Sequence, residues 1–516
     1  MSDIALLAEG LVRLGSRCVF GIPGEGPSLE LLAELEKLGS AFYLAPHEAA
    51  GALMAGGFGR VTGIPGVALS IKGPGFSNML SGIASNWLDR NPVLSFSESY
   101  GPRSESHRMH KRMAHAQMVR PVVKAYADNP SPELLTELWE LCLAEEPGPV
   151  HVDFSTCMNR TSFDGSGAET NDDPFLPREI SRLLRDAQRP AVIAGGLATR
   201  RSWRGKLASL QIPVFTTVAG KGAVDETLPH AAGVFTNSGG PFTPEFKLLP
   251  MADLIVGLGL RTSEIIDVKA LPAPLILLDE LKGQGDGLAA VAEAWVDQDA
   301  FSEALDLLEA KEWGLGEVMA AKTALAKTLS PERWLPAGVF RTVQEILPDA
   351  AFFLDTGNFC VIGEHVLTAR HPLHVMGSAQ GRSMGIALPT SVGAALAKRG
   401  TPVVVAAGDG GIRMYPESIT LAVQEKLPLL VLLMSDGYFS SVRQSAVQKG
   451  FPENLVRLTL LSWRSVFEAL GCPARRVESL NELADSLKTW KVNSGPLFLE
   501  LRFDPEAYLA MTEGLR

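Results

Sequence analysis

The sequence predicts an α/β protein made of three doubly wound domains, each built around a parallel sheet. Short apolar strands alternate with helical patterns along the whole chain, and this βα rhythm is typical of parallel sheets covered by helices. The length of 516 residues suits about three domains of ordinary size. A content of 46% hydrophobic and 20% charged residues describes a globular chain with enough apolar side chains for several cores.

The first domain is expected over residues 1–163, where helices and strands alternate regularly. Two of its strands end in turns rich in glycine and proline, Pro23-Gly24 and Lys72-Gly73-Pro74-Gly75. The polar segment 164–177 that follows is expected to be a linker. In chain order, the expected elements are helix 4–14, strand 18–22, helix 28–38, strand 67–71, helix 77–87, strand 93–96 and a closing segment 147–155.

Two further domains are expected over residues 178–325 and 333–516. Strands of the second domain are expected at 191–194, 214–217 and 254–257, with the glycine turns 195–196 and 220–222 between them. Elements of the third domain are strand 351–354, the turn Asp355-Thr356-Gly357-Asn358, the loop 377–389 and two apolar strands at 403–407 and 429–434.

Charge and composition exclude several classes of protein. The net charge of −11 argues against a nucleic-acid partner. Cysteines 18, 142, 157, 360 and 472 are odd in number and lack CxxC spacing, which favours free thiols over disulfides or a zinc site. The N-terminus lacks the basic start and unbroken apolar core of a signal peptide, and no run of about 18 apolar residues offers a membrane span. We therefore expect a cytoplasmic protein with no membrane or nucleic-acid partner.

The segment 403–442 carries the most specific chemical pattern. Its first apolar run stops at Gly408-Asp409-Gly410-Gly411, and its second ends at Ser435-Asp436-Gly437. In an open parallel sheet both turns lie at strand carboxyl ends, where ligands bind. Glycines let backbone N–H groups approach phosphate oxygens, and two carboxylates can share one hard cation. The pattern predicts a site for a diphosphate carried by Mg²⁺.

This segment resembles the C-terminal cofactor motif of thiamine diphosphate (ThDP) enzymes, in which GDG is followed, after a helix and a strand, by paired asparagines. Ser435-Asp436 stands in place of that pair and adds a negative charge beside an anionic cofactor. The resemblance implies that Asp409, Asp436 and the carbonyl of Tyr438 bind Mg²⁺. It also implies diphosphate contacts from Asn358, Gly408, Gly410 and Gly411.

A second motif, His47-Glu48 through Gly63, resembles the pattern with which acetolactate synthase-like ThDP enzymes grip the aminopyrimidine ring. There a glutamate, hydrogen-bonded to the ring nitrogen, drives the tautomerisation that activates the cofactor, and a pKa near neutrality suits this task. Glu48 is the candidate for that role, and its neighbour His47 is a candidate substrate contact. The alternative is a glutamate that only favours a helix dipole.

Smaller matches extend the resemblance over nearly the whole chain. Phe20-Gly21-Ile22-Pro23-Gly24 resembles the FGxPG turn of the family, and 72–78 resembles its SGPGxxN loop, which makes Asn78 a cofactor contact. The loop 381–389 matches the one that supplies a large apolar side chain beneath the cofactor. Met384 takes that position, and the carbonyl of Arg382 would hold the 4′-amino group. Alternatively, Met384 is a core residue that fills an irregular gap.

Substrate identity depends on the basic run 107–121. In the acetolactate synthase group, a Phe-Gln or similar pair lies about ten residues before an Arg-Pro, and His110 and Lys111 occupy its place here. These side chains suit a carboxylate, sulfonate or phosphonate, or His110 relays protons. The alternative is a solvated basic loop. His115 and Gln117, later in the run, are expected to be structural.

The central domain departs from acetolactate synthase where that enzyme binds FAD. Segment 259–264 replaces its arginine-rich GxRFDDR, and 234–240 replaces its glycine-rich stretch. FAD is therefore not expected. A nicotinamide cofactor is not expected either, because no GxGxxG opens a helix.

The resemblance implies a ThDP- and Mg²⁺-dependent decarboxylase or carboligase that acts on a small 2-oxo acid, as acetolactate synthase does. One alternative is a simple decarboxylase of the benzoylformate or pyruvate type. A second is a ThDP-binding paralogue without turnover. In this family the pyrimidine and diphosphate domains meet across a subunit boundary, so a homodimer or homotetramer with active sites at the subunit interface is expected.

Overall fold

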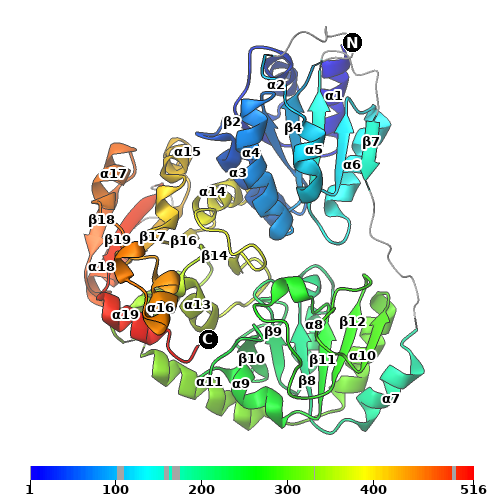
Figure 1. The fold of residues 1–516 in the computed structure, drawn as a ribbon, viewed down its shortest axis with the longest axis vertical. Helices are drawn as coiled ribbons and strands as arrows, with labels where there is room; N and C mark the ends of the chain where they lie inside the picture. The colour runs from blue at the N-terminus through cyan, green and yellow to red at the C-terminus, as the bar shows by residue number, and fades with distance from the viewer. Residues whose placement is uncertain are drawn as a thin grey trace.

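Three α/β domains make up the fold in a computed structural model that describes residues 2–100, 110–155, 162–165, 175–330, 332–490 and 495–515. In Figure 1 the N-terminal domain (blue to cyan), the central domain (green) and the C-terminal domain (yellow to red) each form a sheet with helices on both faces. The described parts of the chain contain no helix with the length and apolarity needed to cross a membrane.

The N-terminal sheet has the strand order β2-β1-β3-β4-β6-β5-β7. Its strands are β1 (Cys18–Gly21), β2 (Ala41–Leu44), β3 (Gly66–Ser70), β4 (Val93–Glu98), β5 (Ala125–Asp128), β6 (Pro149–Phe154) and β7 (Ser162–Gly165). Its helices are α1 (Asp3–Arg13), α2 (Pro27–Lys37), α3 (Glu48–Thr62), α4 (Pro74–Leu88), α5 (His115–Val119) and α6 (Pro132–Leu143). The expected elements of this domain are present within a few residues of the predicted bounds.

Strand β7 corrects the prediction that a linker begins at residue 164. Residues 162–165 pair with β5 in the antiparallel direction, with Ala125 opposite Gly165. An edge strand of this kind needs only backbone hydrogen bonds to its neighbour, so a polar segment can form it without an apolar pattern. Residues 166–174 of the expected linker lie outside the described residues.

The central sheet has the order β10-β9-β8-β11-β12-β13, and all its pairs are parallel. Its strands are β8 (Pro190–Ala194), β9 (Val214–Thr216), β10 (Ala231–Val234), β11 (Leu254–Leu258), β12 (Leu275–Asp279) and β13 (Ala292–Trp295). The helices are α7 (Arg178–Asp186), α8 (Arg204–Ser209), α9 (Pro244–Leu248), α10 (Gln298–Glu309) and α11 (Leu315–Leu329), the last of which leads into the C-terminal domain.

The C-terminal sheet is also parallel, with the order β15-β14-β16-β17-β19-β18. Its strands are β14 (Ala351–Leu354), β15 (Val375–Gly377), β16 (Val403–Gly408), β17 (Leu429–Ser435), β18 (Ala474–Val477) and β19 (Leu497–Arg502). Its helices are α12 (Pro336–Ile346), α13 (Asn358–Val366), α14 (Ala387–Ala397), α15 (Ile419–Gln424), α16 (Ser440–Lys449), α17 (Trp463–Ala469), α18 (Leu480–Thr489) and α19 (Pro505–Met511).

Strand order determines where ligands can bind in each domain. In every sheet the chain leaves its first strand toward one side and later continues on the other, so a crevice opens between two neighbouring strands. These strands are β1 and β3, β8 and β11, and β14 and β16. The turns predicted to bind cofactor, after β3 and after β16, both lie at such crevices.

Helices α3 and α14 join the N-terminal and C-terminal domains through direct backbone contact. A Cβ atom on Gly57 would lie 1.9 Å from the carbonyl oxygen of Thr390, and one on Gly393 would lie 1.9 Å from that of Met54. Only glycine fits at these two positions. The small residues of α3 therefore serve the packing of two domains.

Charged side chains join the N-terminal domain to the central domain. The Glu145 carboxylate lies 2.5 Å from Arg200 and 2.6 Å from Arg261, and Arg261 is fully buried. Burial alone would raise the pKa of Glu145, but the two guanidinium groups outweigh it and lower this pKa to about 2. The carboxylate thus stays charged at the domain boundary.

Replacement of Glu145 with glutamine is expected to lower the free energy of unfolding by about 3 kcal/mol at pH 7, because it leaves buried guanidinium groups without full compensation. The pKa of an unfolded glutamate is about 4.3. Since the folded value lies lower, the stabilisation is present above that pH and is lost as the pH falls toward 2. Denaturant unfolding at pH 7 and pH 3 should show the two proteins converging at acid pH. Equal stability at pH 7 would contradict this account, and Glu34→Gln, in an exposed pair with Lys37, is the control.

Candidate active site

The diphosphate cradle predicted from the sequence is assembled around Asp409. This buried carboxylate accepts hydrogen bonds from the Ser435 hydroxyl (2.9 Å) and from the backbone N–H groups of Asp436 (2.9 Å) and Gly437 (2.8 Å). The turn after β16 is thereby tied to the turn after β17. The structure therefore brings Asp409 and Asp436 together, as the sequence predicted.

Asp436 is 8% exposed and lies beside Asp409. Its carboxylate accepts hydrogen bonds from the Tyr438 N–H (3.2 Å) and the Ser440 hydroxyl (2.6 Å). Burial raises the pKa of Asp436 to about 6, and the negative charge of Asp409 adds to this rise, whereas the two hydrogen bonds act to lower the pKa. Burial also raises the pKa of Asp409. Burial makes it unfavourable for both adjacent carboxylates to be charged at once. A divalent cation bound between them would compensate these charges, and carboxylate oxygens are ligands that such a cation prefers.

A cavity of about 210 Å³ adjoins the cradle and provides a test of whether a diphosphate fits. Asn358, at the start of α13, is 3% exposed, and its amide nitrogen has no hydrogen-bond partner among the described residues. A Cβ atom on Gly410 would lie 2.5 Å from the Phe439 ring and 2.7 Å from the Met384 sulfur. A buried donor without an acceptor and a turn whose glycine leaves room beside the Phe439 ring and the Met384 sulfur fit an anionic group.

The loop that carries Met384 is held by Asp355, a residue that the sequence analysis did not single out. Both carboxylate oxygens of Asp355 lie 2.9 Å from the Gly385 nitrogen. Burial raises the pKa of this carboxyl to about 7, whereas the surrounding amide groups act in the opposite direction. Met384 lines the cavity, and the Arg382 side chain pairs with Glu364 at 2.6 Å. The sequence signal that could have identified Asp355 is its position directly after the buried strand β14.

In the N-terminal domain, Glu48 is the first residue of α3 and is 8% exposed. The Asn78 amide donates a hydrogen bond of 3.1 Å to the Glu48 Oε2 atom. His47 caps the same helix, and its Nδ1 atom accepts a hydrogen bond from the Ala49 N–H (3.1 Å). The structure thus joins Glu48 with Asn78 and gives His47 a local structural contact.

Glu48 and the cradle do not share the cavity described above. Every residue that lines this cavity belongs to the C-terminal domain, from Thr356 to Tyr508. Glu48 and Asn78 are therefore not among the residues that line this cavity, and the neighbouring His47 ring lies 5.7 Å from the ring of Tyr415 in the C-terminal domain.

His110 and Lys111 are both exposed, and the Lys111 backbone lies against Gly73 of the turn 72–75. A Cβ atom on Gly73 would lie 2.2 Å from the Lys111 carbonyl oxygen. The nearby ring of Tyr100 has Lys72 at 5.5 Å and Arg112 at 5.1 Å from its centroid. Residues 107–109 of the basic run lie outside the described residues, as does Cys157, while the other four cysteines are buried. Lys72 and Arg112 thus add to the predicted basic groups.

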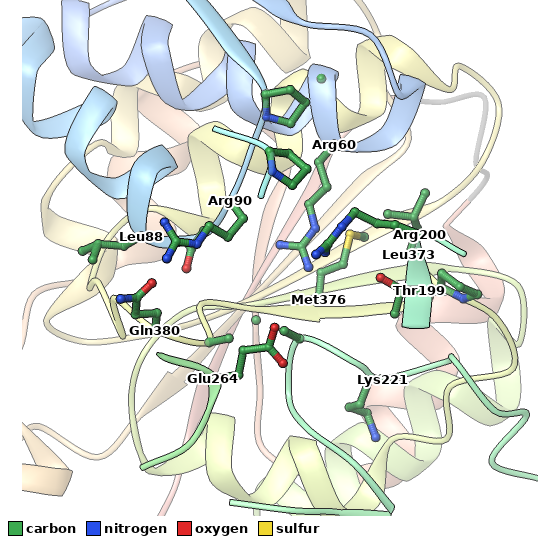
Figure 2. A pocket seen from close by; sticks show the side chains of 18 of the residues that line it. Arg60, Leu88, Arg90, Thr199, Arg200, Lys221, Glu264, Leu373, Met376 and Gln380 are labelled. Atoms are coloured by element: carbon green, nitrogen blue, oxygen red, sulfur yellow. The ribbon is translucent and has the colours of Figure 1, made fainter. Parts of the chain in front are cut away.

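A cavity of about 440 Å³ lies where the three domains meet, and Arg60, Arg200 and Glu264 are among its lining residues (Figure 2). The Glu264 carboxylate accepts hydrogen bonds of 2.7 Å from the Gly196 N–H and the Thr217 hydroxyl. This places an acidic group of the chain on the glycine turn at the β8/β11 crevice, where a dinucleotide phosphate would bind. The negative charge of Glu264 therefore opposes a phosphate at this turn.

Comparison with known proteins identifies the family. Three family models match the chain: the N-terminal thiamine pyrophosphate-binding domain of thiamine pyrophosphate enzymes at residues 3–118, their central domain at 178–279, and their C-terminal thiamine pyrophosphate-binding domain at 355–501. The three domains of the fold thus correspond to the three domains of thiamine pyrophosphate enzymes. The chain belongs to the ThDP-dependent enzyme family of 2-oxo acid decarboxylases and carboligases, and its two binding domains imply thiamine diphosphate as cofactor.

Several similar proteins align over nearly the full length of the chain. A probable acetolactate synthase large subunit of Methanocaldococcus jannaschii is 25% identical over 99% of this chain and 93% of its own length. A probable 2-ketoarginine decarboxylase of Pseudomonas aeruginosa is 28% identical (96% and 93%), and an acetolactate synthase of Bacillus subtilis is 24% identical (97% and 92%). The relatives thus include both carboligases and a decarboxylase.

Proposed function

We propose that the protein is a ThDP- and Mg²⁺-dependent 2-oxo acid decarboxylase or carboligase of the acetolactate synthase type. The observation that carries this proposal is the pair of half-sites: the carboxylate cradle of the C-terminal domain, and the buried Glu48 with its Asn78 partner. Similarity to acetolactate synthases over nearly the whole chain supports it.

In this proposal, residues of the C-terminal domain hold the charged end of the cofactor. Asp409, Asp436 and the carbonyl of Tyr438 bind Mg²⁺. Diphosphate oxygens accept hydrogen bonds from Asn358 and from the backbone of Gly408, Gly410 and Gly411, whose lack of side chains keeps this approach open. Bound ThDP supplies a nucleophilic carbon and an electron sink for decarboxylation.

The aminopyrimidine end is assigned to Glu48, Asn78, Arg382 and Met384. Glu48 would hydrogen-bond to a ring nitrogen of the aminopyrimidine and promote its function as a base, while Asn78 orients the Glu48 carboxylate. The carbonyl of Arg382 would accept a hydrogen bond from the amino group, and Met384 would pack against the cofactor. Apolar walls exclude water from the reacting carbon.

Assembly into a homodimer or homotetramer is part of the proposal. The cradle cavity is lined by residues of the C-terminal domain alone, which supports a site that is completed by Glu48 of a second copy. Light scattering on the purified protein should give at least a dimer, and a monomer with full activity would contradict the shared site.

Charge around the turn 72–75 supports an anionic substrate. His110 and Lys111, with His47 as a further candidate, would contact its carboxylate or a second anionic group, whereas a solvated basic loop remains the alternative. Lys111→Gln is expected to raise KM about tenfold and to change kcat less than about twofold, because a charged contact worth about 1.4 kcal/mol is lost in ground and transition states alike. Steady-state kinetics measure this, with the exposed Lys37→Gln as control. An unchanged KM would favour the solvated loop.

A simple decarboxylase is the second candidate. It is favoured by His110 and Lys111 in place of the Phe-Gln pair, by the poor fit of FAD to the central crevice, and by similarity to a probable 2-ketoarginine decarboxylase. We further propose that FAD is not a cofactor of this protein.

One experiment distinguishes the candidates. The protein with ThDP and Mg²⁺ is incubated with pyruvate and with branched, aromatic, sulfonated and phosphonated 2-oxo acids, with and without aldehyde acceptors, and products are followed by NMR. A hydroxyketone identifies a carboligase, and an aldehyde identifies a decarboxylase. Absence of turnover with every substrate, despite ThDP binding, would overturn the proposal in favour of a non-catalytic ThDP-binding paralogue.

A further inference from the structure

A buried cluster of His115, His151, Asp153 and Tyr126 lies beneath the turn 72–75, and no role in the proposed function has been given to it. Asp153 Oδ1 lies 2.8 Å from His115 Nδ1 and 3.3 Å from His151 Nε2, and Asp153 Oδ2 accepts a hydrogen bond of 2.8 Å from the Tyr126 hydroxyl. His115 and Asp153 are 5% and 4% exposed, and His151 is fully buried. Such a network fixes the orientation of each side chain.

Hydrogen bonding determines the tautomer of His115. Its Nε2 atom accepts a hydrogen bond from the Gly73 N–H at 3.0 Å, so this nitrogen carries the lone pair. The proton is therefore on Nδ1, which donates to Asp153. Burial alone would raise the pKa of Asp153, but its hydrogen bonds to both histidines outweigh it and lower that pKa, so the acceptor is a charged carboxylate. Phe76 stacks on the imidazole with the ring centroids 4.1 Å apart.

The position of Gly73 determines where several residues of the candidate site lie. Gly73 has a φ of 66° and caps α4, the helix that carries Asn78. A Cβ atom on Gly75 would lie 3.2 Å from the Glu48 Oε1 atom, and the Lys111 carbonyl lies against Gly73. Any shift of this turn therefore moves Asn78 relative to Glu48 and displaces the loop of Lys111.

We propose that His115 is a positioning residue. Oriented by Asp153, it holds the Gly73 amide and thereby keeps the turn 72–75, Asn78 and the Lys111 loop in place around Glu48. The proposal deepens the proposed function and rests on it for its catalytic consequence. The expectation that His115 is structural accounts for its burial but not for its bond to this turn.

A metal ion is the competing interpretation, because ligand atoms of His115, His151 and Asp153 lie within 4.8 Å of one another. Both nitrogens of His115 are already used, one by Gly73 and one by Asp153. A metal would have to displace one of these bonds, and elemental analysis of the purified protein decides the point. About one transition-metal ion per chain, lost in His115→Phe, would overturn the proposal.

The first test uses hydrogen exchange in the cofactor-free protein, which needs no turnover. His115→Phe is expected to increase exchange of the Gly73 amide about tenfold, since a hydrogen bond worth about 1.4 kcal/mol is lost. His151→Phe, the same substitution in the same cluster, is the matched control and should leave this amide within about twofold of the wild type. His115→Gln should restore protection, because its amide oxygen can accept from Gly73. Equal exchange in the two phenylalanine variants would overturn the proposal.

The second test uses the holoenzyme with a 2-oxo acid that it turns over. His115→Phe is expected to lower kcat about tenfold. ThDP affinity, to which the metal and diphosphate contacts of the C-terminal domain contribute most, should change less than about threefold, and His115→Gln should recover most of kcat. A loss of ThDP affinity equal to the loss of kcat would indicate a merely structural role. If the wild type turns over no 2-oxo acid, the proposed function fails, while the exchange experiment still decides whether His115 holds the turn.

Discussion

Replacement of Glu48 with glutamine is expected to lower kcat by about 10³-fold while the protein stays folded and binds ThDP with Mg²⁺ nearly as well as before. A positioned acid or base contributes about 10²–10⁴-fold to a proton transfer. Glutamine keeps the length of the side chain and an oxygen that can accept from Asn78, but it cannot stabilise the activated tautomer of the aminopyrimidine. The diphosphate contacts lie in another domain and stay intact.

Three measurements on the Glu48→Gln variant separate catalysis from stability: steady-state turnover, titration with ThDP, and exchange of the cofactor's thiazolium C2 proton with deuterium. Both turnover and C2 exchange should fall together. If Glu48 served only the dipole of α3, its replacement would cost about 0.3–1 kcal/mol of stability and leave the chemistry unchanged. An unchanged kcat would therefore remove Glu48 from the mechanism.

Replacement of Asp409 with alanine is expected to weaken Mg²⁺-dependent ThDP binding by at least about 10²-fold. The variant loses a proposed metal ligand, and it also loses the acceptor that ties the turn after β17 to the turn after β16. Charge-assisted contacts of this kind are each worth about 1.5–3 kcal/mol. Isothermal titration with ThDP, with and without Mg²⁺, measures the loss.

Two further variants identify the cause of that loss. Ser435→Ala removes one hydrogen bond to Asp409 without touching a proposed ligand, so its affinity should remain within about threefold of the wild type. Asp409→Asn keeps a coordinating oxygen but not the charge, and should fall between the wild type and alanine. Full Mg²⁺-dependent affinity in Asp409→Ala would show that this carboxylate does not bind the metal.

Sequence patterns predicted the elements of the cradle because each is local. An apolar run followed by Gly408-Asp409-Gly410-Gly411 specifies a buried strand and a tight turn within a few residues, and Ser435-Asp436 follows the next buried strand in the same way. Glu48, the first residue of α3, was instead singled out by the motif that resembles the family pattern.

Sequence patterns did not predict the roles of residues that act through partners far away along the chain. Asp355 acts through the Gly385 amide, and His115 acts through Gly73 and Asp153. The glycines of α3 were part of a cofactor motif in the sequence, but the structure gives Gly57 a different task, the close contact with α14. None of these partners lies near its counterpart along the chain.

The sequence by itself predicted the three α/β domains from hydrophobic periodicity and turn chemistry, which are local properties of short segments. Its motifs predicted the family by resemblance, and with it the residue types of the candidate cofactor site. Only the tertiary structure decided which turns meet, that Glu264 lies at the central crevice, and that the cradle cavity is lined by residues of the C-terminal domain. These outcomes follow from strand order and domain packing, which bring together residues too far apart in sequence for any local pattern to relate them.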